Sequence, residues 1–363
     1  MQNAVRAIFA STPTHRLVGV GGNKRQHAGA ALLSAMLTVT LVATFASAAL
    51  WQQFRSVEIE TAERGRQQSW LILTGALDWA RLVLREDARS GDIDHLGEPW
   101  AVPLEEARLT NFLAVDGTTS DIERDAFLSG SITDMQSRFN LANLVEGSVK
   151  SDVGLASLRR LCELLDLAPQ VFTTLSENYF LASKLPDGVS TASDFLQPQR
   201  IEQLTWLGID AGTVALLAPH VTVLPTRSPV NLNTASALVI AASTPNLTVA
   251  EAEKLVAARE RRQFSTIADA KKILANAEIN FSEGAHSVST RYFEVTGLLR
   301  LDQLTVSERS LVVREKLLVS TVWRSRGAAR EGAIRQSASP EVASREGASR
   351  EGALPGSVTV NRP

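Results

Sequence analysis

The feature that most constrains this chain is an uncharged stretch near its N-terminus. From Gln26 to Phe54 the sequence contains no Asp, Glu, Lys or Arg. Within this stretch, Ala30–Trp51 reads AALLSAMLTVTLVATFASAALW. A helix of this length spans about 33 Å, which is enough to cross the hydrocarbon core of a bilayer. The sequence therefore predicts one membrane-spanning helix.

The charges before this stretch predict its orientation. Residues 1–29 contain no acidic residue and four basic ones: Arg6, Arg16, Lys24 and Arg25. Positive charge flanking a span favours the cytoplasmic side, and Trp51 suits the opposite interface. We expect a single-pass protein of a bacterial inner membrane, with its N-terminus in the cytoplasm and its bulk in the periplasm.

A second pattern predicts how the N-terminus is processed. Gly29 lies between the basic cluster and the apolar run, as in prepilin-type leaders, which are cut before the hydrophobic helix so that the helix is kept. Cleavage after Gly29 leaves Ala30 as the new N-terminus. The fifth residue of such a mature chain is usually glutamate, but here it is Ser34. A carboxylate in hydrocarbon is costly unless it is paired, commonly with the terminal amine of the next subunit. Its absence suits a subunit at the tip of a fibre.

Two other interpretations of the apolar stretch stay open at this point. The first is an ordinary secretory signal, although the run is too long for a typical signal and Ala-Ser-Ala at 46–48 is a weak cleavage match. The second is a plain membrane anchor that is not processed.

Beyond the span, the pattern alternates between helical and strand-like segments. Gln52–Arg89 has an amphipathic helical pattern that stops at Ser90-Gly91-Asp92. Residues 148–285 are predicted to be largely helical. Four short segments have strand patterns: Phe127–Ile132, Arg138–Leu144, Tyr292–Leu301 and Glu308–Thr321. This order favours an α+β domain that carries a helical insertion over a series of tandem domains.

The predicted organisation therefore has six segments. They are a leader (1–29), a transmembrane and spine helix (30–90), the first part of a pilin-like α+β domain with an antiparallel sheet (91–147), an inserted all-helical domain (148–285), the second pilin-like part (286–323) and a disordered tail (324–363). The tail repeats Arg-Glu-Gly-Ala at 330–333, 345–348 and 350–353 and has no aromatic residue. The single cysteine, Cys162, has no partner for an internal disulfide and is predicted to be buried among leucines.

Part of the helical region resembles one half of a helix-hairpin-helix DNA-binding fold. The similarity lies in VNLNTASA (230–237) and AEAEKLVAARERRQFSTIADAKKIL (250–274). In DNA-binding examples a glycine-rich turn lets backbone N–H groups approach a phosphate. Here the turn is Ser243-Thr244-Pro245-Asn246-Leu247 and has no glycine. With a net charge of only +2 around it, a structural role without nucleic acid is favoured.

Motifs for catalysis are missing from the sequence, so we expect no enzyme. The five histidines are scattered, and no G-x-S-x-G elbow, Walker loop or H-E-x-x-H motif is present. Carboxylates in predicted loops suit Ca²⁺, although no EF-hand pattern supports a site. The candidates are Asp92, Asp94, Asp116 and Asp121.

Together these features resemble the type II secretion system protein K family, the large minor pseudopilin at the pseudopilus tip. The resemblance rests on the Gly29/Ala30 signal without the usual acid and on four motifs in the family's order: DHLGEPWAVPL (94–104), ITDMQSRFNLANL (132–144), LPTRSPVNLNTAS (224–236) and RYFEVTG (291–297). It implies a pilin-like fold, cleavage after Gly29 by prepilin peptidase and methylation of the Ala30 amine. The implied partners are the other minor pseudopilins and the inner-membrane assembly platform. Family members can bind calcium, but the resemblance gives no ligand by number in this chain.

The main alternative is a membrane-anchored helix-hairpin-helix DNA receptor of the competence type. Such a receptor would use residues 145–285 to bind duplex DNA with a steep dependence on salt.

Overall fold

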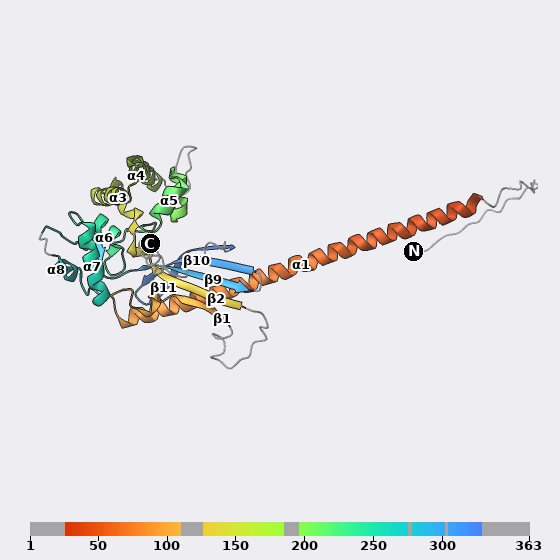
Figure 1. Cartoon of the computed structure of the whole chain (residues 1–363), viewed down its shortest axis with the longest axis horizontal. Helices are drawn as coiled ribbons and strands as arrows, with labels where there is room; N and C mark the ends of the chain where they lie inside the picture. Colours follow the sequence, from red (N-terminus) through yellow and green to blue (C-terminus); the bar gives the residue numbers. More distant parts are fainter. Residues whose placement is uncertain (1–25, 110–125, 185–195, 275–277, 302–303, 329–363) are drawn as a thin grey trace, which may run out of the picture. The chain divides into compact units, whose positions relative to one another are not determined.

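The computed structural model describes residues 26–109, 126–184, 196–274, 278–301 and 304–328 (Figure 1). The chain divides into two compact units, residues 1–64 and 65–363. Helix α1 (Gln26–Ser90, 65 residues) contributes to both units. It ends at the Ser-Gly-Asp sequence where the sequence predicted its end.

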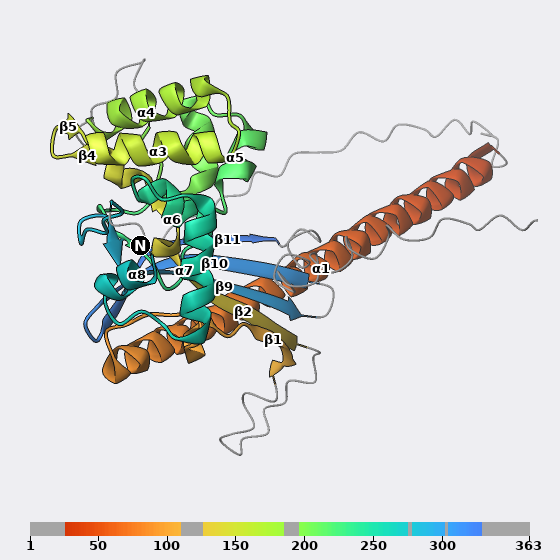
Figure 2. The same ribbon diagram turned by 60° about the vertical axis from the view of Figure 1, so that its left-hand side comes forward.

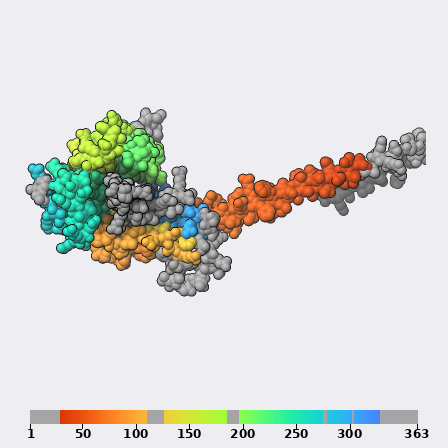
Figure 3. All heavy atoms as spheres, in the orientation of Figure 1, coloured from red at the N-terminus to blue at the C-terminus, as the bar shows by residue number. Residues whose placement is uncertain are grey.

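In the first unit, α1 is a long rod (Figure 3), and its residues from Ala30 to Trp51 are largely apolar. Every side chain from Gly29 to Arg64 is exposed, including those of Leu33, Phe45 and Trp51. The hydroxyl groups of this part bond to carbonyl groups three or four residues earlier in the same helix; they belong to Ser34, Thr38, Thr40, Thr44, Ser47 and Thr61. Such internal pairing is what a lipid environment requires. Among the described residues, α1 is long and apolar enough to cross a membrane.

In the second unit, the remainder of α1 packs on one face of a five-stranded antiparallel sheet (Figure 2). The strands lie in the order β1-β2-β9-β10-β11. Their bounds are β1 Leu104–Arg108, β2 Ala126–Asp134, β9 Tyr292–Leu301, β10 Leu304–Glu315 and β11 Leu318–Ala328. This is the predicted α+β class.

The core of the sheet domain forms between one face of α1 and one face of the sheet. Leu73, Leu77 and Leu84 of α1 are spaced four and seven residues apart, so they share one buried helix face. They meet alternate residues of β9, among them Phe293. The Trp100 ring lies edge-on to Phe293 at 5.2 Å and covers the end of this core.

The remaining helices come from a long insertion between two neighbouring strands. β2 pairs with β9 from Ala126↔Leu301 to Asp134↔Phe293, so the chain leaves and re-enters the sheet at one end. Between them lie α3 (Asp152–Leu164), α4 (Pro169–Ser183), α5 (Ala211–Leu217), α6 (Ala237–Ser243), α7 (Val249–Arg261) and α8 (Ile267–Ile273). Short strands and 3-10 helices join them: η3 (Met135–Ser137), β3 (Phe139–Asn140), η4 (Leu141–Leu144), β4 (Val145–Glu146), β5 (Val149–Lys150), η5 (Ile201–Leu207), β6 (Val221–Thr222), β7 (Val230–Asn231) and β8 (His286–Ser287).

The insertion has two hydrophobic cores of its own. One gathers Leu158, Leu175 and Leu204 with their neighbours, and the other gathers Val239 and Leu255. Short polar side chains begin several of its helices by accepting a backbone N–H, as Ser and Thr do at N-caps. These caps are Ser151, Asp210, Ser236 and Thr248. Cys162 is buried, as predicted, and burial raises the pKa of its thiol to about 11.

Two strand predictions were wrong in detail. In Arg138–Leu144 only Phe139–Asn140 is a strand, which pairs in parallel with β6, because the Asn140 side chain caps a 3-10 helix over the residues that follow. The predicted strand Glu308–Thr321 is a hairpin, because the chain turns at Lys316 in the left-handed region (φ 56°).

The limits of the large sheet also differ from the predicted segments. Residues 324–328, predicted as part of the tail, extend β11, where Arg324 and Arg326 pair with buried Glu308. The rest of the tail lies outside the described residues. His286–Ser287 pairs with β7 inside the insertion rather than with the large sheet. The excursion from the sheet therefore covers residues 135–291, and the predicted block 148–285 lies within it.

Candidate functional site

The four sequence motifs singled out above meet at one place in the second unit. Asn231 donates from Nδ2 to the Asp94 carbonyl at 3.1 Å and to Asp134 Oδ2 at 3.0 Å. Gln136 donates to the Pro229 carbonyl at 3.1 Å and accepts the backbone N–H of Arg291 at 2.8 Å. We call this place the polar junction; its side chains are Asp94, Asp134, Gln136, Asn231, Thr234 and Arg314.

Asp134 is the buried centre of the junction. Its carboxylate is 2 % exposed and lies where β2 leaves the sheet. It accepts the Gln136 N–H at 2.6 Å, the Thr234 hydroxyl at 2.6 Å and the Asn231 amide. Burial raises the pKa of Asp134, and these hydrogen bonds oppose the rise. A carboxylate supplied with this many donors fixes the start of the insertion against β7.

Two asparagines of the second motif make the equivalent connection deeper in the insertion. Asn140 donates to the Thr226 carbonyl at 2.8 Å and accepts the Leu224 N–H at 3.1 Å. Asn143 donates to the Ser228 carbonyl and accepts the Ser228 N–H, at 2.8 and 3.0 Å. These amides replace a strand partner, so segments far apart in sequence are joined without a regular sheet.

Arg314 of β10 closes the junction on the side of α1. Its guanidinium is 7 % exposed and donates to Asp87 Oδ2 at 2.7 Å and to Asp94 Oδ1. It also donates to the carbonyls of Thr290 at 3.1 Å and Leu84 at 3.5 Å. The Arg314 guanidinium thus binds the end of α1, the loop after it and the segment that leads into β9.

Asp94 has a pKa well above that of an exposed aspartate. Burial raises it to about 7, although Arg314 and the Thr290 N–H, which donates to Asp94 Oδ2 at 2.7 Å, both lower it. Its partner acid Asp87 is 7 % exposed. The pair therefore depends on the guanidinium to keep two buried carboxylates close together.

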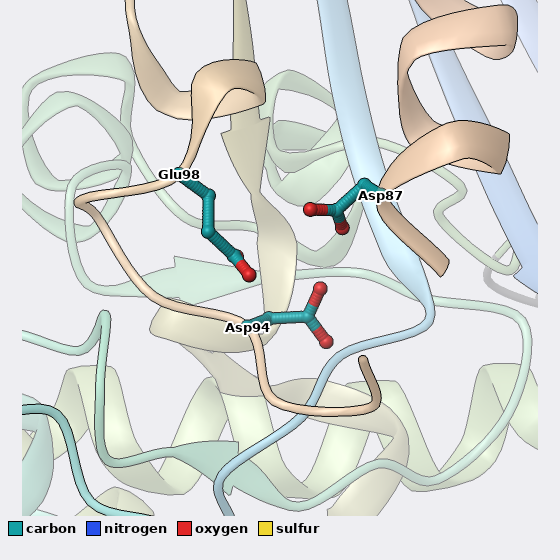
Figure 4. Close-up of side chains that lie close together, drawn as sticks. All are labelled: Asp87, Asp94 and Glu98. Carbon is teal, nitrogen blue, oxygen red and sulfur yellow. The ribbon is translucent and has the colours of Figure 1, made fainter. Parts of the chain in front are cut away.

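Asp87, Asp94 and Glu98 have the spacing of a metal site, since one oxygen of each lies within 4.8 Å of the others (Figure 4). Arg314 already takes the position of a cation between Asp87 and Asp94. Glu98 is committed as well, because it accepts the Trp100 indole N–H at 2.7 Å and the His95 N–H at 2.9 Å. With Arg314 in place, these residues do not fit calcium.

Of the predicted calcium candidates, only Asp94 enters the junction. Asp92 is exposed, and Asp116 and Asp121 lie outside the described residues. The prediction missed Arg314 altogether. Its signal is that even-numbered residues of β10 face α1, so an arginine at 314 sits on the buried side and requires an acid partner.

The predicted processing residues lie in the first unit, apart from the junction in sequence. Gly29 and Ala30 are exposed within α1, which already begins at Gln26. The Ser34 hydroxyl donates to the Ala31 carbonyl at 2.9 Å. Ser34 therefore needs no polar partner from another chain.

The helix-hairpin-helix turn is built differently from a phosphate site. Asn246 adopts the left-handed conformation (φ 60°) that the turn requires, in place of glycine. At the start of α7 the Glu251 carboxylate accepts both the N–H and the hydroxyl of Thr248, at 3.0 and 2.8 Å. A negative charge thus covers the helix end that a DNA phosphate would approach, which disfavours the DNA-receptor alternative.

Comparisons with known proteins agree with the family resemblance. The family model described as type II secretion system (T2SS), protein K matches residues 230–289. The chain is 29% identical over 326 residues to the type II secretion system protein K of Pseudomonas aeruginosa, covering 84% of this chain and 90% of that protein. It matches a chain in the crystal structure of the GspK-GspI-GspJ complex of the enterotoxigenic Escherichia coli type 2 secretion system with a TM-score of 0.57. That match is 19% identical and covers 74% of this chain and 99% of the other.

The fold therefore defines a pilin-like α+β protein with one long N-terminal helix and a large helical insertion. Within that class, the chain is similar to the type II secretion system protein K family, and the comparisons support the role of a minor pseudopilin. The conclusion confirms the resemblance found in the sequence. The motif that the family model matches contains Asn231 and Thr234 of the polar junction.

Removal of one junction hydroxyl tests how much the junction stabilises the fold. Thr234→Val removes a donor to buried Asp134, and a hydrogen bond to a charged group is worth about 2 kcal/mol. We expect the thermal midpoint of the detergent-solubilised protein to fall by about 4–8 °C.

Thr222→Val is the matched control for this measurement. Thr222 is also a buried threonine, but its hydroxyl has no hydrogen-bond partner among the described residues. Its replacement should leave the midpoint nearly unchanged. Equal midpoints for the two variants would show that the Asp134 network contributes little.

Proposed function

We propose that this minor pseudopilin caps the pseudopilus at its tip and helps to initiate its assembly during export of folded proteins across the outer membrane. The observation that carries the proposal is Ser34. At the position where pilins usually carry an acid, the side chain is neutral and bonds within its own helix. A subunit of this kind needs no terminal amine from a neighbour above it.

The action of α1 would be physical rather than chemical. Its apolar surface first holds the subunit in the inner membrane, with the leader in the cytoplasm and the bulk in the periplasm. As the fibre is extracted, the same surface packs against the helices of other pseudopilins. The exposed side chains of Leu33, Phe45 and Trp51 supply area for both environments. An apolar helix passes from lipid to a helix bundle with little change in free energy from solvation.

The insertion would make the subunit a cap. It adds two separate hydrophobic cores to a sheet domain that already has its own. The polar junction binds the insertion to the sheet and to the end of α1. A body of this size on the last subunit is expected to leave no place for a further subunit.

The partners we propose follow from the solved relative. That structure is a complex of GspK with GspI and GspJ. By analogy, this chain would assemble with the minor pseudopilins of its own secretion system, and its membrane helix would engage the assembly platform. Prepilin peptidase would cleave after Gly29 and methylate the Ala30 amine.

The cleavage proposal predicts the fate of a Gly29→Ala variant. A residue with a Cβ before the scissile bond should block cleavage and leave a form that keeps its leader and does not assemble. The measurement is N-terminal sequencing and intact mass of the membrane fraction. Gly75→Ala is the control, since neither Gly29 nor Gly75 has any atom within 4 Å of an added Cβ. An unmethylated or methylated Ala30 terminus in Gly29→Ala would contradict the proposal.

The tip proposal predicts that an acid at position 34 is harmful. Ser34→Glu places a carboxylate in the span without a partner amine, at a cost of about 2.5 kcal/mol or more. We expect secretion to fall several-fold, whereas Ser34→Gln, of the same size but uncharged, should fall much less. Normal secretion by Ser34→Glu would mean that the missing acid has no bearing on tip position.

A further inference from the structure

The surroundings of Arg314 are those of a site for a hard cation. Four oxygen atoms accept its N–H groups, two from the carboxylates of Asp87 and Asp94 and two from the carbonyls of Leu84 and Thr290. Glu98 completes an acidic set whose oxygens lie within 4.8 Å of one another. Carboxylates and backbone carbonyls together are the ligands that Ca²⁺ takes in proteins.

These oxygens come from three separate segments, and the cation comes from a fourth. Leu84 and Asp87 come from the last turns of α1, and Asp94 comes from the loop that follows. Thr290 precedes β9, and Arg314 lies near the end of β10. Phe293 closes the site from one side, with its ring 4.9 Å from the Arg314 Cζ. Because the site is buried, its carboxylates stay ionised together only with a cation beside them.

We propose that Arg314 is the resident cation of this site, and that loss of its guanidinium turns the site into one that binds a divalent hard cation. The wild-type chain then needs no metal at this position. The positive charge that holds the end of α1 to the sheet is then carried by the Arg314 side chain and not by a bound metal ion.

The proposal has a direct test in the full-length, detergent-solubilised protein. Arg314→Ala should lower the thermal midpoint in the presence of EGTA. Calcium chloride at about 1 mM should raise the midpoint of this variant by about 3 °C, for a site of extracellular affinity. The rise caused by calcium should be smaller in the wild type, because Arg314 fills this position.

Arg309→Ala is the matched control for nonspecific bridging by calcium. Arg309 is also held by two carboxylates, from Glu202 and Glu294, but it is 39% exposed, and within the described part of the chain no backbone carbonyl is bonded to it. Calcium should not change the midpoint of this variant. A calcium response equal to that of Arg314→Ala would overturn the proposal.

A second readout covers the case in which Arg314→Ala is too unstable for a clear midpoint. The Trp100 indole donates to Glu98 at the site, so Trp100 can transfer excitation energy to bound Tb³⁺, a luminescent substitute for Ca²⁺. Tb³⁺ luminescence excited through tryptophan, and displaced by calcium, is expected for Arg314→Ala and not for wild type or Arg314→Lys. Luminescence from the wild type equal to that of Arg314→Ala would overturn the proposal. So would the absence of luminescence from an Arg314→Ala protein whose circular dichroism spectrum is native.

Discussion

The second unit depends on one buried positive charge. Arg314 lies between Asp87 and Asp94 and also bonds to carbonyls of α1 and of the segment before β9. A buried guanidinium is tolerated only when its charge and its donors are matched, so the elements around it have little freedom to move. This single requirement holds the end of α1, the loop after it and the start of β9 in fixed positions relative to one another.

Buried polar groups of the polar junction hold the insertion in the same way. Asp134 ends β2, and its donors Asn231 and Thr234 come from β7 and the turn after it. Gln136, two residues after Asp134, accepts the backbone N–H of Arg291 at 2.8 Å, so the long excursion between two adjacent strands is also joined near its two ends. In a fibre that is extracted by its helices, force on α1 would pass to the sheet and the insertion through these bonds. A cap that stays attached under such force is consistent with the proposed position at the tip.

Much of this architecture could be predicted from patterns in the sequence. The uncharged run, the end of α1 and strands β2 and β9 follow from hydrophobicity and turn residues, because each is a local property. The junction could not be predicted in this way, since Asp94, Asn231 and Arg314 are distant in sequence and meet only in the fold. The hairpin turn at Lys316 was not predicted because it lies within an apolar segment. Arg324 and Arg326 were assigned to the tail because the sequence does not show that they pair with Glu308.

Site-specific photo-cross-linking in the assembled secretion system tests the central claim most directly. A photoreactive residue at Leu71, which is 74% exposed on α1, would be compared with one at Leu216, which is 58% exposed on α5 of the insertion. A subunit that caps the fibre should cross-link to another pseudopilin from position 71 and to none from position 216. Cross-links from position 216 to a pseudopilin, with none from position 71, would place a subunit beyond this one and contradict the account.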